Sequence, residues 1–400
     1  MSRSGGAVEQ QLLLLLLKEE LSREERFEAR SLVARFHLPD FLHLARHHFL
    51  VPWLCGRGDR FPELFDPAMR EALEAIRRAE APRALHWTDR LLDLLDRFER
   101  AGVRALPYKG PALGRLLYGS PADRPFGDLD ILVTPRDLPA AERIARGAGF
   151  RRRWALTPRQ ERAFLRSSSH LELILPGEPP VPLDLHWSPL AEHFSVPFDT
   201  EGLLEHSGWM DLGGRRVRAF RREELFLLLS IHCVKHRFER LNWLKDLDRL
   251  LRLEGGLDGK GLLEPARRLR VERLLGVCLR VLARGLGTPL TPELERAAAA
   301  RPAAGIADRL LISLQVPPEP LGLFGKARFY LRLREDFRDW VAYGLRLLVI
   351  LATPTFEEWE RWKLPDRWFF LYYLYRPVRL AARRLFGIGR ESALHERCGT

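Results

Sequence analysis

Apolar residues recur at intervals of three and four along the first hundred residues of the chain. The spacing is clearest in Leu91, Leu94, Leu95 and Phe98. It predicts helices, because it gathers apolar side chains on one face of a 3.6-residue turn. The six leucines at 12–17 are followed by Lys18 and two glutamates, so they predict a helix and not a secretory signal.

The pattern changes between Val103 and about Asp199, where short apolar runs are bounded by Gly and Pro. These runs predict strands at 103–108, 129–133, 171–175 and 181–186. Helices are expected at 111–117 and 135–147, the second with Thr134 as its N-cap and Pro135 at its first position. Strands and helices in this order predict a mixed sheet of the α+β class.

The helical spacing returns after about Arg222 and continues to the end of the chain. We therefore predict three regions: an N-terminal helical region at 1–102, a mixed core at 103–200 and a C-terminal helical region at 201–400. The last part combines eight aromatic or leucine residues at 368–375 with a basic stretch at 376–390. We expect a buried aromatic helix with a solvated basic end; the alternative is contact with an anionic membrane or a protein partner.

The chain has 400 residues and a net charge of +12, and most of the positive charge is arginine. Such a surface favours anions, which include nucleotides, nucleic acid and acidic lipids. The four cysteines lie far apart and form no CxxC pair, so neither a zinc ribbon nor a disulfide framework is predicted. No segment is apolar for the roughly 20 residues that cross a bilayer. We expect a cytoplasmic protein.

The stretch Gly127-Asp128-Leu129-Asp130 carries the strongest chemical signal. Residues two apart on a strand share a face, so Asp128 and Asp130 would direct two carboxylates to one point. Two such carboxylates repel each other unless a cation lies between them. Oxygen ligands favour Mg²⁺, or Mn²⁺, over zinc.

A second predicted strand supplies a third carboxylate. Asp184 lies between two leucines, with His186 on the same face. An acid on a core strand needs a partner or a metal. Three carboxylates from two strands can hold two ions and activate a hydroxyl, and Asp184 can then also act as a general base.

The residues before the aspartate pair suit a phosphate. Gly110 follows a predicted strand and opens a helix, where the missing side chain lets an anion approach the helix N-terminus. Lys109 and Arg124 are cations placed to meet it. Arg124 has the alternative of pairing with a neighbouring acid.

These residues resemble a known family. Lys109-Gly110, Tyr118, Arg124, the segment Gly127–Val133 and Asp184-Leu185-His186-Trp187 are similar to the uncharacterised bacterial nucleotidyltransferase family of the DNA polymerase β-like superfamily. Later segments agree with it. They are His232, Lys235-His236, Leu241, Trp243-Leu244, Asp246 and Arg376-Pro377-Val378-Arg379.

The resemblance implies a polymerase β-like sheet core flanked by helical regions, and transfer of a nucleoside monophosphate from an NTP, with ATP expected, to an acceptor. Asp128, Asp130 and Asp184 would then be the metal-binding and catalytic carboxylates. Where the superfamily has Gly-Ser or Gly-Gly, this chain has Gly110-Pro111. Pro111 offers neither an N–H nor a hydroxyl, and Lys109 would compensate electrostatically.

Residues 225–251 are expected to form one helix, with His232, His236, Trp243 and Asp246 on one face. That face closes a nucleotide pocket, with Lys235 or His236 reaching phosphate, or it packs the helix on the sheet with Asp246 as a hydrogen-bond partner. Zinc is not favoured there because no third ligand is suitably spaced. Ser167–Ser169 and His170 lack the Gly-x-Ser-x-Gly context of a nucleophilic serine.

Two other functions remain open alongside the enzyme. One is a catalytically inactive scaffold with the same fold that binds nucleotides or anions. The other is a nucleotidyltransferase that modifies RNA ends, for which the net charge is suitable. Neither the acceptor nor the base of the NTP follows from the sequence.

Overall fold

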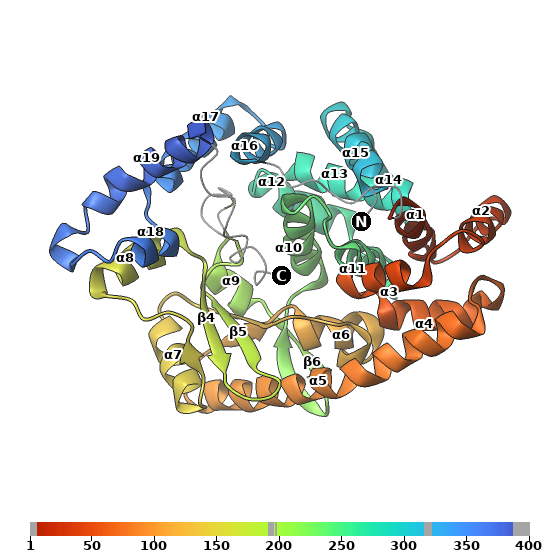
Figure 1. Cartoon of the computed structure of the whole chain (residues 1–400), viewed down its shortest axis with the longest axis horizontal. Helices are drawn as coiled ribbons and strands as arrows, with labels where there is room; N and C mark the ends of the chain where they lie inside the picture. Colours follow the sequence, from red (N-terminus) through yellow and green to blue (C-terminus); the bar gives the residue numbers. More distant parts are fainter. Residues whose placement is uncertain (1–5, 191–195, 197, 316–321, 387–400) are drawn as a thin grey trace. The chain divides into compact units, whose positions relative to one another are not determined.

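The computed structural model describes residues 6–190, 196, 198–315 and 322–386. The N-terminal region is helical, as its spacing predicts (Figure 1). Its helices are α1 (Ala7–Leu16), α2 (Arg23–Val33), α3 (Leu38–His47), α4 (Val51–Arg60) and α5 (Pro67–Arg100). Ser22 begins α2 with a capping box, since its hydroxyl accepts from the Glu25 N–H while the Glu25 carboxylate accepts from the Ser22 N–H.

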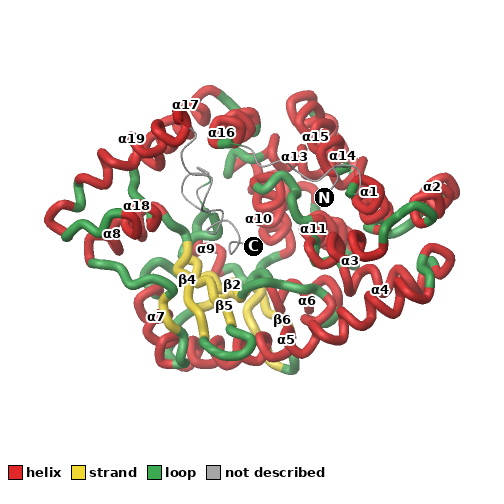
Figure 2. Tube along the Cα trace, viewed as in Figure 1, coloured by secondary structure: helices red, strands yellow, loops and turns green. Residues whose placement is uncertain are grey.

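The middle of the chain carries the strands (Figure 2). They are β1 (Ala105–Pro107), β2 (Leu129–Val133), β3 (Arg151–Arg152), β4 (His170–Leu175) and β5 (Val181–His186), which form one sheet in the order β1-β2-β5-β4-β3. Between them run α6 (Gly110–Tyr118), α7 (Leu138–Gly147) and α8 (Pro158–Ser167), followed by α9 (Thr200–Glu205). The α+β class expected from the sequence is confirmed.

Strand β2 is enclosed, with all five residues buried. Strand β5 alternates instead, because Val181, Leu183 and Leu185 are buried while Pro182 and Asp184 are half-buried. Helix α7 contacts β5, and its Ala141 and Ala145 are fully buried. The alternation places the polar side chains of β5 on one face of the sheet.

The start of α7 and the first part of the C-terminal region differ from the expectation. Helix α7 begins at Leu138, not at Pro135, because the Thr134 hydroxyl accepts from the Asp137 N–H in a turn before the helix. Within the predicted C-terminal helical region, strands β6 (Gly208–Leu212) and β7 (Arg215–Ala219) form an antiparallel hairpin. Gly213 and Gly214 supply the positive φ values of its turn.

The remaining chain is helical. Its helices are α10 (Arg222–Lys235), α11 (Leu241–Arg252), α12 (Gly259–Arg268), α13 (Glu272–Val281), α14 (Pro292–Ala299), α15 (Arg301–Leu314), α16 (Leu323–Arg332), α17 (Phe337–Ala352), α18 (Phe356–Arg361) and α19 (Leu371–Phe386). Helix α13 contacts α10, α14 and α15. Among the described residues, no helix combines the length and the apolar character that crossing a membrane requires.

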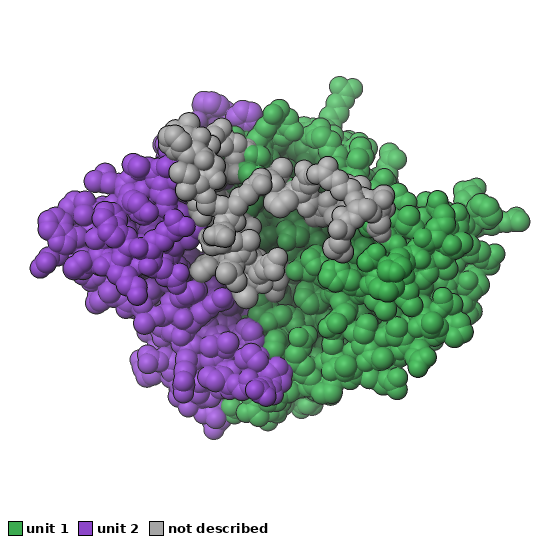
Figure 3. Space-filling view, in the orientation of Figure 1, with its two compact units in different colours: residues 1–96, 106–129, 205–335 green, residues 97–105, 130–204, 336–400 purple. Residues whose placement is uncertain are grey.

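The chain divides into two compact units (Figure 3). The first contains residues 1–96, 106–129 and 205–335, and the second contains residues 97–105, 130–204 and 336–400. The boundary between Leu129 and Asp130 falls inside the Asp128-Leu129-Asp130 motif. The three regions predicted at 1–102, 103–200 and 201–400 stay a prediction.

The expectation for the C-terminal segment holds only in part over the described residues, where Phe369 and Tyr372 are buried as expected. Trp368 and Phe370 are about half exposed, whereas Arg379 is buried. The reason is an acidic pair on α18, Glu357 and Glu358, which draws the arginines of α19 inward. Residues 387–390 of the basic stretch lie outside the described residues.

Candidate metal centre and phosphate-binding residues

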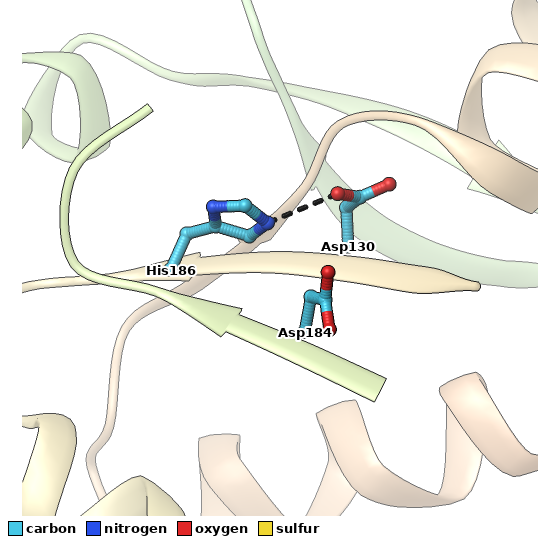
Figure 4. Close-up of side chains that lie close together, drawn as sticks. All are labelled: Asp130, Asp184 and His186. Atoms are coloured by element: carbon cyan, nitrogen blue, oxygen red, sulfur yellow. Dashed lines mark hydrogen bonds and ion pairs between the residues drawn. The ribbon is translucent and has the colours of Figure 1, made fainter. Parts of the chain in front are cut away.

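Two neighbouring strands of the sheet bring three polar side chains together. Asp130 lies on the buried strand β2, and Asp184 and His186 lie two apart on β5. Each residue offers one ligand atom, and these atoms lie within 4.8 Å of one another. Figure 4 shows the three side chains extending into the same space.

His186 and Asp130 are joined directly. The Nε2–H of His186 donates to Oδ1 of Asp130 over 3.0 Å, and the two side chains are 9% and 2% exposed. Asp184 is more open at 18%. The site is thus buried at β2 and reachable from the Asp184 side.

The adjacent strand β4 adds two polar residues. In the antiparallel register His170 lies opposite His186, and Glu172 lies opposite Asp184. The His170 Nε2 is 3.8 Å from the Asp184 Oδ2, and the rings of His170 and His186 are 5.0 Å apart. His170 had been predicted only beside the serines, because its position opposite His186 depends on the register between β4 and β5.

The three ligand atoms fit a divalent cation. Metal–ligand distances of about 2.0 to 2.2 Å allow two ligand atoms of one ion to be at most about 4.4 Å apart, so a small side-chain shift is sufficient. Two carboxylates are typical ligands of Mg²⁺ and Mn²⁺, whereas imidazole is more usual with transition metals. The donor set therefore suits Mn²⁺ at least as well as Mg²⁺.

Asp128 is not part of this group of three. It lies directly before β2, in the first unit, and is half-buried. The structure therefore joins two of the three predicted aspartates with a histidine that the prediction had placed on the right face but not among the ligands. A role for Asp128 in metal binding stays a prediction.

Gly110 begins α6 and closely approaches Asp128, the first residue of the aspartate motif. Its φ is +49°, and a Cβ built on it would lie 3.2 Å from the carbonyl oxygen of Asp128 and 3.5 Å from the Phe126 ring. The left-handed backbone and this short distance both require glycine. Lys109 is the N-cap residue of α6, so its position before a helix N-terminus is as predicted.

Arg124, predicted to meet phosphate, is held by a carboxylate. Its Nε and Nη2 atoms donate to Oδ2 of Asp246 over 3.0 and 2.8 Å, and the Tyr118 hydroxyl donates to Oδ1 over 2.9 Å. Arg124 and Asp246 are 6% and 2% exposed. This buried ion pair ties the loop before the aspartates to α11 within the first unit.

The single helix expected at 225–251 is wrong. It is broken into α10 and α11, because Arg237 and Phe238 adopt φ values of 54° and 56°. Phe238 is buried at this break. The change of direction brings the Trp243 ring to 4.5 Å from the His232 ring and 5.4 Å from the His236 ring, measured between centroids. The contact is therefore between α11 and the end of α10, not along one helix face.

Positive charge gathers at the end of α10. Burial lowers the pKa of Lys235 to about 8, and Lys109 and Lys326 lower it further. Burial and the same charges lower the pKa of His236 to about 3, so its ring is neutral. We call Lys109, Lys235 and Lys326 the lysine cluster; all belong to the first unit. Lys326 had not been predicted, because it is distant in sequence.

The sequence was compared with models of known protein families. Residues 35–287 match a family described as uncharacterised nucleotidyltransferase. The chain belongs to this family. The match includes both strands of the candidate metal centre, the start of α6 and the α10–α11 pair. No curated protein matches the chain.

Membership in the nucleotidyltransferase family agrees with the resemblance found in the sequence. It implies an NTP as substrate in general terms. The structure also contains a candidate site for a divalent cation, formed by Asp130, Asp184 and His186.

Proposed function

We propose that this nucleotidyltransferase is an active, divalent-metal-dependent enzyme that transfers a nucleoside monophosphate from an NTP to a hydroxyl acceptor. The observation that carries the proposal is the convergence of Asp130, Asp184 and His186 within 4.8 Å on two adjacent strands. An inactive scaffold has no need to hold two carboxylates and an imidazole this close, since like charges repel and burial of charge is costly.

The metal would be held by Asp130 and Asp184, with His186 as a third ligand or as the residue that orients Asp130. When bound, a divalent cation supplies charge neutralisation at the α-phosphate and lowers the pKa of an attacking hydroxyl. Asp128 is retained in the proposal as a further ligand, because it adjoins β2 in sequence. Mg²⁺ and Mn²⁺ are both suited to this donor set.

Asp184 is the proposed general base. The acceptor oxygen forms a bond to the α-phosphorus, the bond to the β-phosphate bridging oxygen breaks, and pyrophosphate leaves. The proton of the acceptor hydroxyl passes to the carboxylate of Asp184, which is the most exposed of the three site residues. His170, 3.8 Å from that carboxylate, lies close enough to relay the proton through a water molecule.

Phosphate binding is assigned to the first unit. The proposed residues are Lys109, Gly110, Lys235 and His236, with Lys326 added by the lysine cluster. The charges of Lys109 and Lys326 act on Lys235, as its lowered pKa shows, and lysine ammonium groups gathered in this way suit a polyphosphate. Arg124 is assigned a positioning role, because Asp246 already engages its guanidinium.

The test is label transfer from each α-labelled NTP in the presence of Mg²⁺ or Mn²⁺ and a fractionated lysate. We expect one fraction to be labelled by the wild type, and labelling to fall by about a hundredfold or more in Asp130→Asn and in Asp184→Asn. Glu172→Gln is the matched control, because Glu172 lies on the same sheet opposite Asp184 and is engaged by Arg153 at 2.8 Å. Transfer that persists in both Asn variants would overturn the proposal.

The same assay identifies the acceptor class. A labelled fraction that is sensitive to ribonuclease, together with RNA binding that falls steeply with salt, would indicate RNA-end modification. A labelled small molecule or protein would indicate the corresponding acceptor.

A further inference from the structure

Helix α19 has its charges inside and its apolar residues outside. Arg376 contacts Glu358 and the Thr355 hydroxyl, each over 2.8 Å, and Arg379 contacts Glu357 over 2.6 Å. Arg379 is 6% exposed and Glu358 is fully buried. Burial raises the pKa of Glu358, but the Thr355 N–H and Arg376 outweigh it and the net shift is downward, so the carboxylate is charged.

The outer face of this segment is apolar. Five apolar side chains here are exposed by 39 to 66%, two of them just before α19 and three on the helix itself. They are Trp368, Phe370, Tyr373, Leu374 and Val378. A surface helix of a water-soluble domain normally has the opposite arrangement.

Helix α17 also exposes an apolar face, and it contacts α19 (Figure 1). Its apolar side chains are exposed by 44 to 76% with helical spacing. They are Phe337, Trp340, Val341, Leu345, Leu348 and Val349. Tyr343, on the other side of α17, is buried. We call the exposed apolar faces of the two helices the α17–α19 surface.

The protein core fixes this orientation. Tyr372 and Phe369 pack with Trp359 of α18 and Ala163 of α8 in one buried cluster. The Tyr372 hydroxyl also accepts from the Leu364 N–H over 2.9 Å. Turning α19 to bury its apolar face would expose this cluster and separate the arginines from Glu357 and Glu358, so the outward apolar face is built into the fold.

The charged groups around the surface are mostly positive. Within residues 336–382 the exposed basic side chains are Arg338, Arg346, Arg361, Lys363 and Arg367. The exposed acidic side chains in the same range are Asp336 and Glu360. A second copy would present the same positive charge and be repelled, whereas a negatively charged surface would be attracted.

We propose that the α17–α19 surface binds an anionic lipid bilayer, with the helices lying in the plane of its interface. Tryptophan, phenylalanine and leucine on one helix face flanked by arginine and lysine are the chemistry of interfacial helices. The apolar side chains enter the boundary between headgroups and acyl chains, and the basic residues contact acidic headgroups. This binding is independent of the nucleotidyltransferase chemistry.

Flotation of the full chain with lipid vesicles tests the proposal. We expect binding to vesicles containing about one third phosphatidylglycerol, and little binding to pure phosphatidylcholine. The variants Leu345→Glu with Leu348→Glu, and Leu374→Glu with Val378→Glu, should each weaken partitioning by about tenfold or more, because an apolar contact is lost and a repelled charge is added.

The control carries the same change on exposed apolar residues elsewhere. Phe27 and Ile312, in the first unit, are 76% and 68% exposed, so Phe27→Glu with Ile312→Glu should leave vesicle binding intact. Circular dichroism of each variant verifies its folding. Equal loss in the control, absence of binding by the wild type, or a dimer seen by light scattering that the surface variants abolish would each overturn the proposal.

Discussion

The Nε2–H of His186 donates to Oδ1 of Asp130 over 3.0 Å across two neighbouring strands. This hydrogen bond uses Nε2 of His186 and Oδ1 of Asp130, and a cation would need these atoms as ligands. Metal binding at Asp130 therefore either exchanges the proton of His186 for the ion or leaves His186 to hold the carboxylate from behind.

Metal binding should depend on both aspartates. We expect Mn²⁺ and Mg²⁺ to raise the Tm of the wild type, because a ligand that binds only the folded state stabilises it, by about 2.7 kcal/mol at a hundred times its Kd. The shift should vanish in Asp130→Asn combined with Asp184→Asn and persist in Glu172→Gln. A metal-dependent shift of unchanged size in the double variant would exclude this site.

Replacing His186 separates the two arrangements of the site. A histidine that ligates the ion, or one that orients Asp130, costs about 10- to 100-fold in affinity when removed. A direct ligand makes His186→Ala weaken Mn²⁺ more than Mg²⁺, since imidazole suits the transition metal. An orienting role weakens both ions equally. Isothermal titration gives the two Kd values, and unchanged affinity for both would remove His186 from the site.

The Arg124–Asp246 pair should be structural. Arg124→Ala leaves a buried carboxylate without its main cation, which costs about 3 to 5 kcal/mol. Tyr118→Phe removes one hydrogen bond to the same carboxylate and should cost about 1 to 2 kcal/mol. Denaturant unfolding measures both. If Arg124→Ala kept the wild-type stability and lost only nucleotide binding, Arg124 would be a phosphate ligand after all.

Lys235 should give the protein a stability that rises in alkaline solution. Its pKa is lowered from 10.5 to about 8 by burial and by its lysine neighbours. Between these values the unfolded chain holds the proton and the folded protein has released it, so stability rises with pH from about 8 to 10.5. Lys235→Met should abolish that rise and be more stable at neutral pH.

Pyrophosphate provides the complementary measurement for the same residue. If Lys235 binds phosphate in its charged form, affinity for pyrophosphate should fall as the pH passes 8, and Lys235→Met should bind weakly at every pH. If Lys235→Met bound pyrophosphate as tightly as the wild type, Lys235 would have only a structural role.

The two ends of α6 offer a matched pair of glycines. Gly110 and Gly119 both have positive φ, but a side chain at Gly110 would meet the Asp128 carbonyl, whereas nothing lies within 4 Å of Gly119. Gly119→Ala should cost about 1 kcal/mol for backbone strain alone. Gly110→Ala should cost more, by about 1 to 2 kcal/mol, and weaken pyrophosphate binding. Thermal unfolding of the two variants compares them, and equal costs would contradict a close approach.

The fold was accessible to sequence reasoning wherever the apolar spacing was regular. Strand β5 matches its predicted range at 181–186, and β2 matches its predicted range at 129–133. A short continuous or alternating apolar run between turn residues is compatible with few structures other than a strand. The break between α10 and α11 was not accessible. Arg237 and Phe238 are not typical left-handed residues, and burial of Phe238 fixes their conformation only in the folded protein.

The sequence predicted the kind of site, a carboxylate metal site, but not the full set of residues that form it. Asp130 and Asp184 followed from acids on apolar strands. That His186 rather than Asp128 completes the group depends on the register between β2 and β5, which no local pattern encodes. Arg124 illustrates the same limit, since its partner Asp246 is 122 residues away.

The inward arginines of α19 also determine what a shorter chain would present. Ending the protein before Leu371 would remove Arg376 and Arg379 together, and Glu357 and Glu358 would lose the cations that face them. It would also remove Tyr372 from the cluster around Trp359. A truncated protein would then carry an acidic patch where the full chain carries an aromatic one. Helix α19 therefore determines the charge of this surface as well as its shape.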